Sequence, residues 1–206
     1  IAGAITYTPD GGFLLGPAPG LRNAWLACGS SVGICQGAGS GKYLAQWIVH
    51  GQSEINMNDF DPRRWGDYAY GEYTKAKAID AYHRNFQLHQ HGEDREAGRP
   101  LFKTPAYERQ AKQGAVFGES FGWERPKWYA PNGETEEYSF ARTNIHKIIS
   151  DECFAVRERC GVLDLSSFSK FEISGPNAEG YLNRLITGIA PKREGKSTLA
   201  YSTTAD

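Results

Sequence analysis

A glycine-rich stretch followed by an amphipathic pattern limits the folds open to this chain more than any other feature. Residues 29–48 are GSSVGICQGAGSGKYLAQWI. A phosphate-binding P-loop requires G-x-x-x-x-G-K-[ST], but Tyr43 stands in place of the serine or threonine and Gln36 in place of the first glycine. The dinucleotide fingerprint G-x-G-x-x-G also fails, because residues 37–41 have the spacing G-x-G-x-G. What remains is a strand, a glycine-rich bend and a helix over about residues 37–50, whose first N–H groups can face a negative group.

The residues around this stretch predict the edge of an α/β domain. IAGAITYT and NAWLACG have the composition of strands, and PDGG between them is a turn sequence. Leu44, Trp47 and Ile48 recur at the i, i+3, i+4 spacing of a buried helix face, and Gly51 is placed to end the helix. We therefore expect strand, turn, strand, bend and helix in this order over residues 1–52.

The next segment, residues 53–138, is polar and rich in aromatic side chains. The sequence DPRRWGDYAYGEYTKAKAIDAYHRNF predicts a helix after Pro62. The stretch that follows, up to about residue 134, favours packed loops over regular structure, since Trp123 and Trp128 flank a proline. We expect a connecting domain without catalytic residues.

The final segment, residues 139–206, predicts two helices and several short strands. Ser150 can cap a helix that carries acidic residues in its first turn and ends at Gly161. VLDLSS and KFEISG are strand sequences, and Pro176 is placed at the first position of a second helix. The expected buried stripe of that helix is Ala178, Tyr181, Leu182 and Leu185. The chain stops within LAYSTTAD, an expected strand, so we expect an internal part of a longer protein.

Composition and charge exclude several classes of partner. The 206 residues are 40% hydrophobic and 23% charged with a net charge of −1, which gives no electrostatic footprint for nucleic acid or an anionic membrane. No apolar run is long enough to span a bilayer, and no signal-peptide pattern is present. His89 and His91 lie in a polar loop without a cluster of further ligands, so we interpret them as a surface pair and expect no metal site.

The four cysteines predict neither a disulfide framework nor a metal site. Cys28 and Cys35 flank the glycine stretch without C-x-x-C spacing. Cys153 and Cys160 are seven residues apart on a predicted helix, which places their Cα atoms roughly 10 Å apart, too far for a disulfide. Reduced thiols in an intracellular compartment are the expected state.

Three groups of motifs, in chain order, resemble the dimethylglycine dehydrogenase and sarcosine dehydrogenase family. TYTPDGGFLLGPAPGLRNAWLACG and GAGSGKYLAQWIVHG resemble the end of its FAD-binding domain, EAGRPLFKTPAYE and GAVFGESFGWERPKWY its central domain, and GVLDLSSFSKFEISGPNA the start of its aminomethyltransferase-like folate domain. The resemblance implies an α+β / α/β fold in three parts. These are the C-terminal portion of the FAD-dependent oxidoreductase domain (1–52), a central connecting domain (53–138) and the N-terminal portion of the folate domain (139–206).

The resemblance also implies an FAD-dependent amine dehydrogenase or oxidase. The family oxidises the N-methyl groups of small amino acids such as dimethylglycine or sarcosine with FAD and passes the one-carbon unit to tetrahydrofolate. It implies an electron acceptor, which is oxygen or an electron-transfer flavoprotein, and an intracellular location, in the bacterial cytoplasm or the mitochondrial matrix. We expect no nucleic-acid or membrane partner.

Site residues follow from matching motif to motif. The residues that should lie along the pyrimidine edge of the flavin are Val32, Gly33, Ile34 and Cys35. In related amine oxidases a lysine that helps to hold the substrate carboxylate stands at the position of Cys35, which cannot supply that charge and could equally be a small buried hydrophobe. Thr8 and Asp10 are candidates on the substrate side, although TPDGG is a good turn sequence with or without a ligand. The catalytic residues stay unknown.

Parts of both expected active sites are absent from these residues. No G-x-G-x-x-G follows a predicted strand, so the pyrophosphate site and the flavin-linking histidine of the family are expected upstream, and the aspartate near folate just after Asp206. We therefore expect residues 1–206 alone to be inactive. The regulatory subunit of pyruvate dehydrogenase phosphatase, a non-catalytic homologue, resembles the same three regions and stays an alternative. A stand-alone folate module is disfavoured by the FAD-domain ending at residues 7–51.

Overall fold

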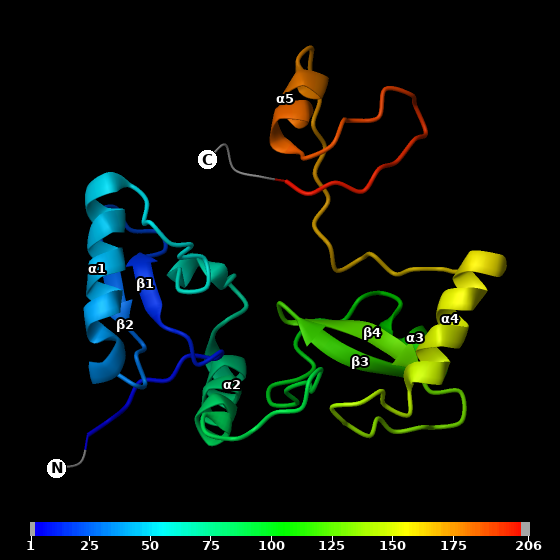
Figure 1. Cartoon of the computed structure of the whole chain (residues 1–206), viewed down its shortest axis with the longest axis horizontal. Helices are drawn as coiled ribbons and strands as arrows, with labels where there is room; N and C mark the ends of the chain where they lie inside the picture. Colours follow the sequence, from blue (N-terminus) through cyan, green and yellow to red (C-terminus); the bar gives the residue numbers. More distant parts are fainter. Residues whose placement is uncertain (1–2, 203–206) are drawn as a thin grey trace. The chain divides into compact units, whose positions relative to one another are not determined.

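The computed structural model describes residues 3–202, which combine short strands with longer helices in a mixed α and β structure (Figure 1). The elements are β1 (Leu14–Pro17), β2 (Trp25–Cys28), α1 (Ile34–His50), the 3-10 helix η1 (Pro62–Arg64), α2 (Gly71–Arg84), α3 (Tyr107–Lys112), β3 (Ala115–Ser120), β4 (Trp123–Tyr129), α4 (His146–Glu158) and α5 (Ala178–Leu185). Within the described residues the strands pair as two antiparallel hairpins, β1–β2 and β3–β4. The chain divides into two compact units between Ser167 and Phe168.

The β1–β2 hairpin and α1 enclose a small apolar core in the first unit. Leu15 of β1 stands opposite Ala27 of β2. The core consists of Phe13, Leu15 and Met57, with Tyr43, Trp47 and Phe60 packed against it. Gly16 lets α1 approach closely, because a Cβ at this position would lie 2.9 Å from the ring of Trp47.

The first predicted strand is wrong for the part that the structure describes. Residues 3–8 contain no strand, and β1 lies beyond the PDGG turn instead. The physical reason is pairing: β1 has a partner in β2, whereas residues 3–8 pair with no strand in the described part, and an unpaired strand is not stable. The turn is confirmed, since the N–H of Gly11 donates to the carbonyl of Thr8 at 3.1 Å.

α1 begins at Ile34, earlier than the sequence predicts. Residues 37–41 lie inside the helix, as expected, and the bend expected before the helix is confirmed as a turn at residues 31–33. A glycine within a helix costs about 1 kcal/mol relative to alanine, and burial of the apolar face of α1 against the hairpin offsets that cost. The predicted end is confirmed, because Gly51 has a φ of 79° and donates its N–H to the carbonyl of Trp47 at 2.9 Å.

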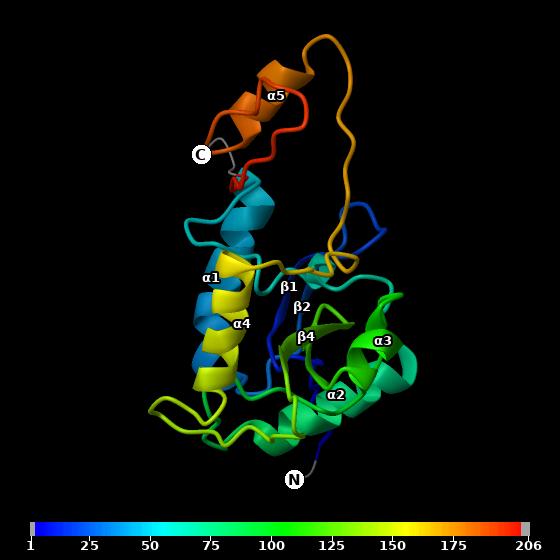
Figure 2. The same cartoon turned by 90° about the vertical axis from the view of Figure 1, so that its right-hand side faces the viewer.

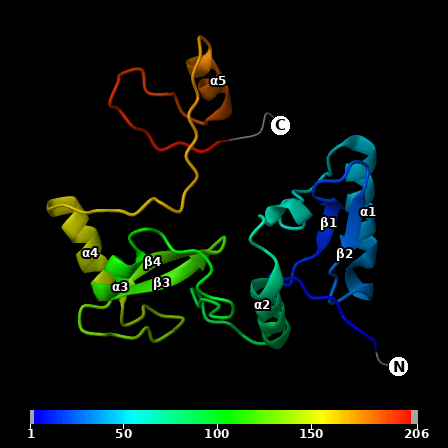
Figure 3. The same cartoon turned by 180° about the vertical axis from the view of Figure 1, so that it is seen from behind.

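The helix expected after Pro62 begins later, at Gly71. Pro62 instead starts η1, whose N-terminus is capped by Asp61, since Asp61 Oδ1 accepts the N–H of Arg63 at 2.8 Å. α2 then follows between the β1–β2 and β3–β4 hairpins, as seen from opposite sides in Figure 1 and Figure 3.

The stretch expected to be irregular contains the β3–β4 hairpin. Trp128 of β4 is only 1% exposed and anchors the strand. Pro126 lies within β4, where the register against β3 shifts between Val116 and Phe117. A proline cannot donate to the ladder, and such an irregularity is where a strand tolerates one. The local composition of this stretch therefore gave the wrong prediction.

α4 begins at His146, so Ser150 lies within the helix and does not cap it. The N–H of His146 donates to the carbonyl of Thr143 at 3.1 Å. Glu152 of α4 accepts the N–H of Tyr129 in β4 at 2.9 Å. This contact with the hairpin, rather than a local cap, fixes the position of the helix.

The second unit contains α5 and long segments without regular structure (Figure 2). KFEISG in this unit, and VLDLSS at the end of the first, form no strand in the described residues, so both predictions are wrong. Their side chains alternate as in a strand, but neither segment has a partner strand here. Ile186 and Ser202 form an isolated bridge, and residues 203–206 of the last expected strand lie outside the described residues.

α5 begins at Ala178, two residues later than the sequence predicts. Its expected buried stripe is only partly buried: Leu182 and Leu185 are half-buried, whereas Tyr181 is 56% exposed. No residue of α5 is completely buried, because too little of the second unit packs against this helix.

Candidate functional site

The residues expected along the flavin edge lie together at the N-terminus of α1. Gly33 precedes the helix with φ 35° and ψ −90°, a conformation that favours glycine. The N–H groups of Cys35 and Gln36 make long turn bonds, of 3.4 and 3.2 Å, to the carbonyls of Val32 and Gly33. Val32 is 45% exposed and Ile34 is 99% exposed. Cys35 is a free thiol that is exposed among the described residues.

A cavity of about 270 Å³ lies beside this end of α1. Its lining residues are Leu15, Ala27, Cys28, Ser30, Gly33, Gly37, Ser40, Gly41 and Leu44. Gly37 and Gly41 share one face of the helix, and a Cβ at either position would meet no atom within 4 Å. The hydroxyl of Ser30 is buried and has no protein partner among the described residues. An open backbone face beside an unpartnered hydroxyl fits the polar edge of a flat ring such as flavin.

The structure places Thr8 and Asp10 in a tight turn next to the same loop. The hydroxyl of Thr8, which is buried, lies 2.9 Å from Asp10 Oδ1 and 2.6 Å from the carbonyl of Gly12. The N–H of Gly12 donates to Asp10 Oδ1 at 2.9 Å. Thr8 also contacts the loop before α1, because a Cβ at Gly29 would lie 3.0 Å from its methyl group. Thr8 therefore links the turn to the start of the loop that carries Gly33.

Arg64 binds the carboxylate of Asp10 with two hydrogen bonds. Its Nε donates to Asp10 Oδ2 at 2.8 Å and its Nη2 to Asp10 Oδ1 at 3.0 Å. Burial alone would raise the pKa of Asp10, but the hydrogen bonds from Arg64 and from the N–H of Gly12, with the charge of the guanidinium, lower it below its usual value. Asp10 is therefore held as a carboxylate, and Arg64 fixes the turn.

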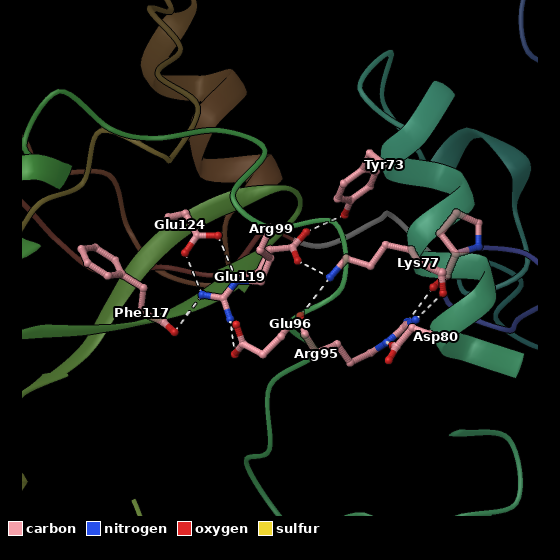
Figure 4. Close-up of polar contacts among 10 residues, drawn as sticks. Tyr73, Lys77, Asp80, Arg95, Glu96, Arg99, Phe117, Glu119 and Glu124 are labelled. Carbon is pink, nitrogen blue, oxygen red and sulfur yellow. Dashed lines mark hydrogen bonds and ion pairs between the residues drawn. The ribbon is translucent and has the colours of Figure 1, made fainter. Parts of the chain in front are cut away.

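A second cavity, of about 370 Å³, adjoins this turn and is walled by α2 and the β3–β4 hairpin. Lys77 of α2 forms an ion pair with Glu119 of β3 and donates to the carbonyl of Arg95 at 3.1 Å. The hydroxyl of Tyr73 donates to Glu119 at 2.5 Å (Figure 4). Burial, together with the bond to the Glu119 carboxylate, raises the pKa of Tyr73. The wall of this cavity is thus a connected set of buried polar groups.

No sequence pattern indicates these contacts. Arg64 and Asp10 are 54 residues apart, and Lys77 and Glu119 are 42 residues apart. Each residue lies in a polar segment where a charged side chain is ordinary, so only the fold brings the partners together. The residues expected along the flavin edge are consecutive in the chain, so a motif can single them out, and their place beside a flavin stays a prediction.

Comparison with known proteins gives matches along most of the chain. Residues 50–104 match the FAD dependent oxidoreductase central domain, and residues 106–206 match the GCVT N-terminal domain. The mitochondrial dimethylglycine dehydrogenase of Mus musculus is 37% identical over 93% of this chain and 22% of its own length. The mitochondrial sarcosine dehydrogenase of Homo sapiens is 32% identical over 96% of this chain and 25% of its own length. The chain belongs to the dimethylglycine and sarcosine dehydrogenase family.

The chain thus spans about a quarter or less of the length of these family members. A further relative is the mitochondrial pyruvate dehydrogenase phosphatase regulatory subunit of Mus musculus, which is 30% identical over 84% of this chain and 21% of its own length. The same stretch of sequence therefore occurs in relatives named as dehydrogenases and in one named as a regulatory subunit.

The two domain matches meet near residue 105 of this family member. The sequence predicts that the folate domain begins at residue 139. The GCVT match begins earlier, at residue 106, so it also includes the β3–β4 hairpin. Lys77 and Arg95 consequently belong to the central-domain match, and Glu119 to the GCVT match. The expected boundaries themselves stay a prediction.

Other expected features concern metals, cysteines and membranes. Within residues 3–202 no group of three or more His, Cys, Asp and Glu side chains is placed to hold a metal ion. His89 and His91 are exposed, and His89 Nε2 lies 3.0 Å from the carbonyl of Arg84. The four cysteines are free. None of the helices in the described part of the chain combines the length and the apolar character that a membrane crossing requires.

Proposed function

We propose that this chain is part of a flavin-dependent oxidoreductase that demethylates an N-methyl amino acid, of the dimethylglycine or sarcosine kind, and passes the one-carbon unit to tetrahydrofolate. The observation that carries this proposal is the order of the two domain matches, in which an FAD dependent oxidoreductase central domain is followed directly by a GCVT N-terminal domain. FAD and tetrahydrofolate are the proposed cofactors, and oxygen or an electron-transfer flavoprotein is the proposed electron acceptor.

The N-terminal end of α1 supports the placement of the flavin. When bound, FAD would be the acceptor of a hydride from the N-methyl carbon, and negative charge would develop at the pyrimidine edge of its ring. The helix dipole of α1 and the backbone from Val32 to Cys35 would stabilise that charge. The hydroxyl of Ser30 would donate to a polar atom of the same edge, which gives this buried group the partner that it lacks within the described residues.

The Thr8–Gly12 turn supports a substrate-side role for Thr8 and Asp10. Thr8 packs against Gly29, at the start of the loop that leads to Gly33. The carboxylate of Asp10 is already engaged by Arg64 and by the turn itself. We therefore propose that Asp10 shapes the turn, and that Thr8 is the member of the pair that adjoins the flavin loop.

A non-catalytic regulatory role is the second candidate function. The observation that favours it is the similarity to the pyruvate dehydrogenase phosphatase regulatory subunit, at 30% identity over 84% of the chain. The two candidates differ in one property, since only the oxidoreductase must hold a redox-active flavin.

The absorbance spectrum of the full-length protein separates the two functions. For the oxidoreductase we expect flavin bands at about 450 nm that bleach when dimethylglycine or sarcosine is added without oxygen. Glycine, which has no N-methyl group, is the matched control and should leave the bands unchanged. A protein without flavin bands would favour the regulatory role, and bands that neither N-methyl amino acid bleaches would contradict the proposed substrate class.

A further inference from the structure

Two arginines from the central-domain match hold the turn that carries Thr8 and Asp10. Arg64 binds both carboxylate oxygens of Asp10, and its Nη1 also donates to the carbonyl of Phe13 at 2.9 Å. Arg95 Nη1 donates to the carbonyl of Pro9 at 2.5 Å. Two consecutive residues of the turn are therefore held by guanidinium groups that lie 54 and 86 residues away in the sequence.

Arg95 is itself fixed by α2. Its Nε donates to Asp80 at 2.5 Å, and its Nη2 donates to the carbonyl of Lys77 at 2.6 Å. The side chain of Arg95 is 27% exposed and that of Asp80 22% exposed, so solvent reaches the contact only in part. A planar guanidinium with donors fixed in three directions is a rigid link, which a flexible lysine could not replace. The position of the turn thus follows the position of α2.

The same network continues from α2 to the GCVT match. Lys77 donates to the carbonyl of Arg95 and forms its ion pair with Glu119 of β3, and Tyr73 donates to the same carboxylate (Figure 4). The side chains of Lys77 and Glu119 are 6% and 11% exposed. A buried pair of this kind keeps its geometry because either charge alone would be strongly disfavoured in this environment.

The cavity beside the network offers no unpaired charge to a ligand. Each charged residue of its lining has an ion-pair partner: Asp10 with Arg64, Lys77 with Glu119, Glu93 with Arg84, Asp94 with Lys127, and Arg95 with Asp80. The charges are therefore used to hold chain segments together. This pattern is typical of a positioning device rather than of a binding site.

We propose that Arg95 is a positioning residue for the substrate side of the flavin site, and that it acts through the Thr8–Gly12 turn with Arg64. The proposal rests on the proposed function, which places Thr8 near the substrate. Arg95 holds Pro9, α2 holds Arg95, and the Lys77–Glu119 pair holds α2 against β3. The central-domain segment, expected from the sequence to be a connector, therefore sets the shape of the site.

The test is anaerobic reduction of the flavin in the full-length enzyme, measured at increasing concentrations of the N-methyl amino acid that bleaches it. For Arg95→Met we expect the concentration for half-maximal reduction to rise about tenfold, because the turn is no longer held. Lys75→Met, on the same helix α2, is the matched control, since Lys75 is 67% exposed and its partner Glu72 is 91% exposed. We expect it to stay within about twofold of the wild type.

A double variant separates positioning from a general loss of stability. Thr8→Ala combined with Arg95→Met should have a smaller effect than the product of the two single effects, because both changes act on one turn. Independent multiplication of the two effects would contradict the proposal. Melting curves and flavin content are recorded beside each rate.

Arg95→Lys decides the matter if Arg95→Met does not fold. Lysine keeps the charge but cannot reach Asp80, the carbonyl of Lys77 and the carbonyl of Pro9 at once, so we expect a clear rise in the half-maximal concentration. A folded, flavin-loaded Arg95 variant with the wild-type concentration dependence would overturn the proposal. A wild-type enzyme that no N-methyl amino acid reduces would instead contradict the proposed function.

Discussion

Arg99 and Glu124 form a buried ion pair in the first unit. Their side chains are 7% and 3% exposed, and Arg99 donates to both carboxylate oxygens of Glu124, at 2.9 and 2.7 Å. The Nη2 of Arg99 also donates to the carbonyl of Phe117 at 2.8 Å. The bond to Glu124 raises the pKa of Arg99 although burial opposes it, so the guanidinium stays charged. The pair joins the loop before α3 to the β3–β4 hairpin.

Replacing Arg99 should therefore destabilise the first unit strongly. Arg99→Met leaves the Glu124 carboxylate buried without a partner, which typically costs about 3 kcal/mol or more of the free energy of unfolding. Urea denaturation followed by tryptophan fluorescence measures this change. Lys103→Met is the control, because its pair with Glu108 is exposed and should contribute little. Equal midpoints for the two variants would show that the Arg99 pair adds no more than a surface contact.

At the scale of elements, α1 offers a test of the proposed flavin site. Gly37 lines the cavity beside the N-terminal end of α1, and Gly39 does not. A Cβ at either position would meet no atom within 4 Å. Alanine at either position should stabilise the helix by up to about 1 kcal/mol. The proposed function then predicts that, in the full-length protein, only Gly37→Ala also slows reduction of the flavin, by about tenfold or more, since its methyl group enters the cavity.

Anaerobic reduction rates and urea midpoints of both alanine variants check this prediction. The midpoints should rise together, whereas the rates should differ. If Gly37→Ala and Gly39→Ala reduce at the same rate as the wild type, the face of α1 that carries Gly37 does not border the ring.

The elements that could be predicted from the sequence are those that depend on neighbouring residues. The turn at Gly11, the end of α1 at Gly51 and β2 follow from local patterns, and the structure confirms them. The strands predicted for residues 3–8 and for KFEISG are wrong, because a strand depends on a partner that its own pattern does not reveal. The β3–β4 hairpin was missed for the converse reason, since its two strands stabilise each other despite Pro126.

The candidate site also combines a part that a local motif can indicate with contacts between distant residues that it cannot. The segment from Val32 to Cys35 is consecutive, so a motif could place it, and its assignment to the flavin stays a prediction. Arg64, Arg95 and Lys77, in contrast, bind residues that lie 42 to 86 positions away in the sequence. One sequence carries no record of such pairings, because each partner alone is an ordinary charged residue on a polar segment.

At the scale of the whole chain, the two compact units differ in how much they bury. The first unit contains the apolar core beside α1 and the hairpin anchored by Trp128. In the second unit, among its described residues, Ala190 is the buried hydrophobic residue, and α5 buries none completely. A segment with few buried contacts opens locally at low cost. The stability of residues 1–206 should therefore be uneven along the sequence.

Hydrogen exchange of residues 1–206 tests this difference directly. We expect the amides of β3 and β4 to exchange slowest, because Trp128 and the Arg99–Glu124 pair close the hairpin against water. Amides of α5 should exchange almost as fast as in an unfolded chain, since no completely buried side chain holds this helix. α4 is the matched comparison: it also buries no residue completely, but the bond from Tyr129 to Glu152 ties it to β4, so its protection should be intermediate. Protection of α5 equal to that of the hairpin would show that the second unit folds cooperatively with contacts of its own.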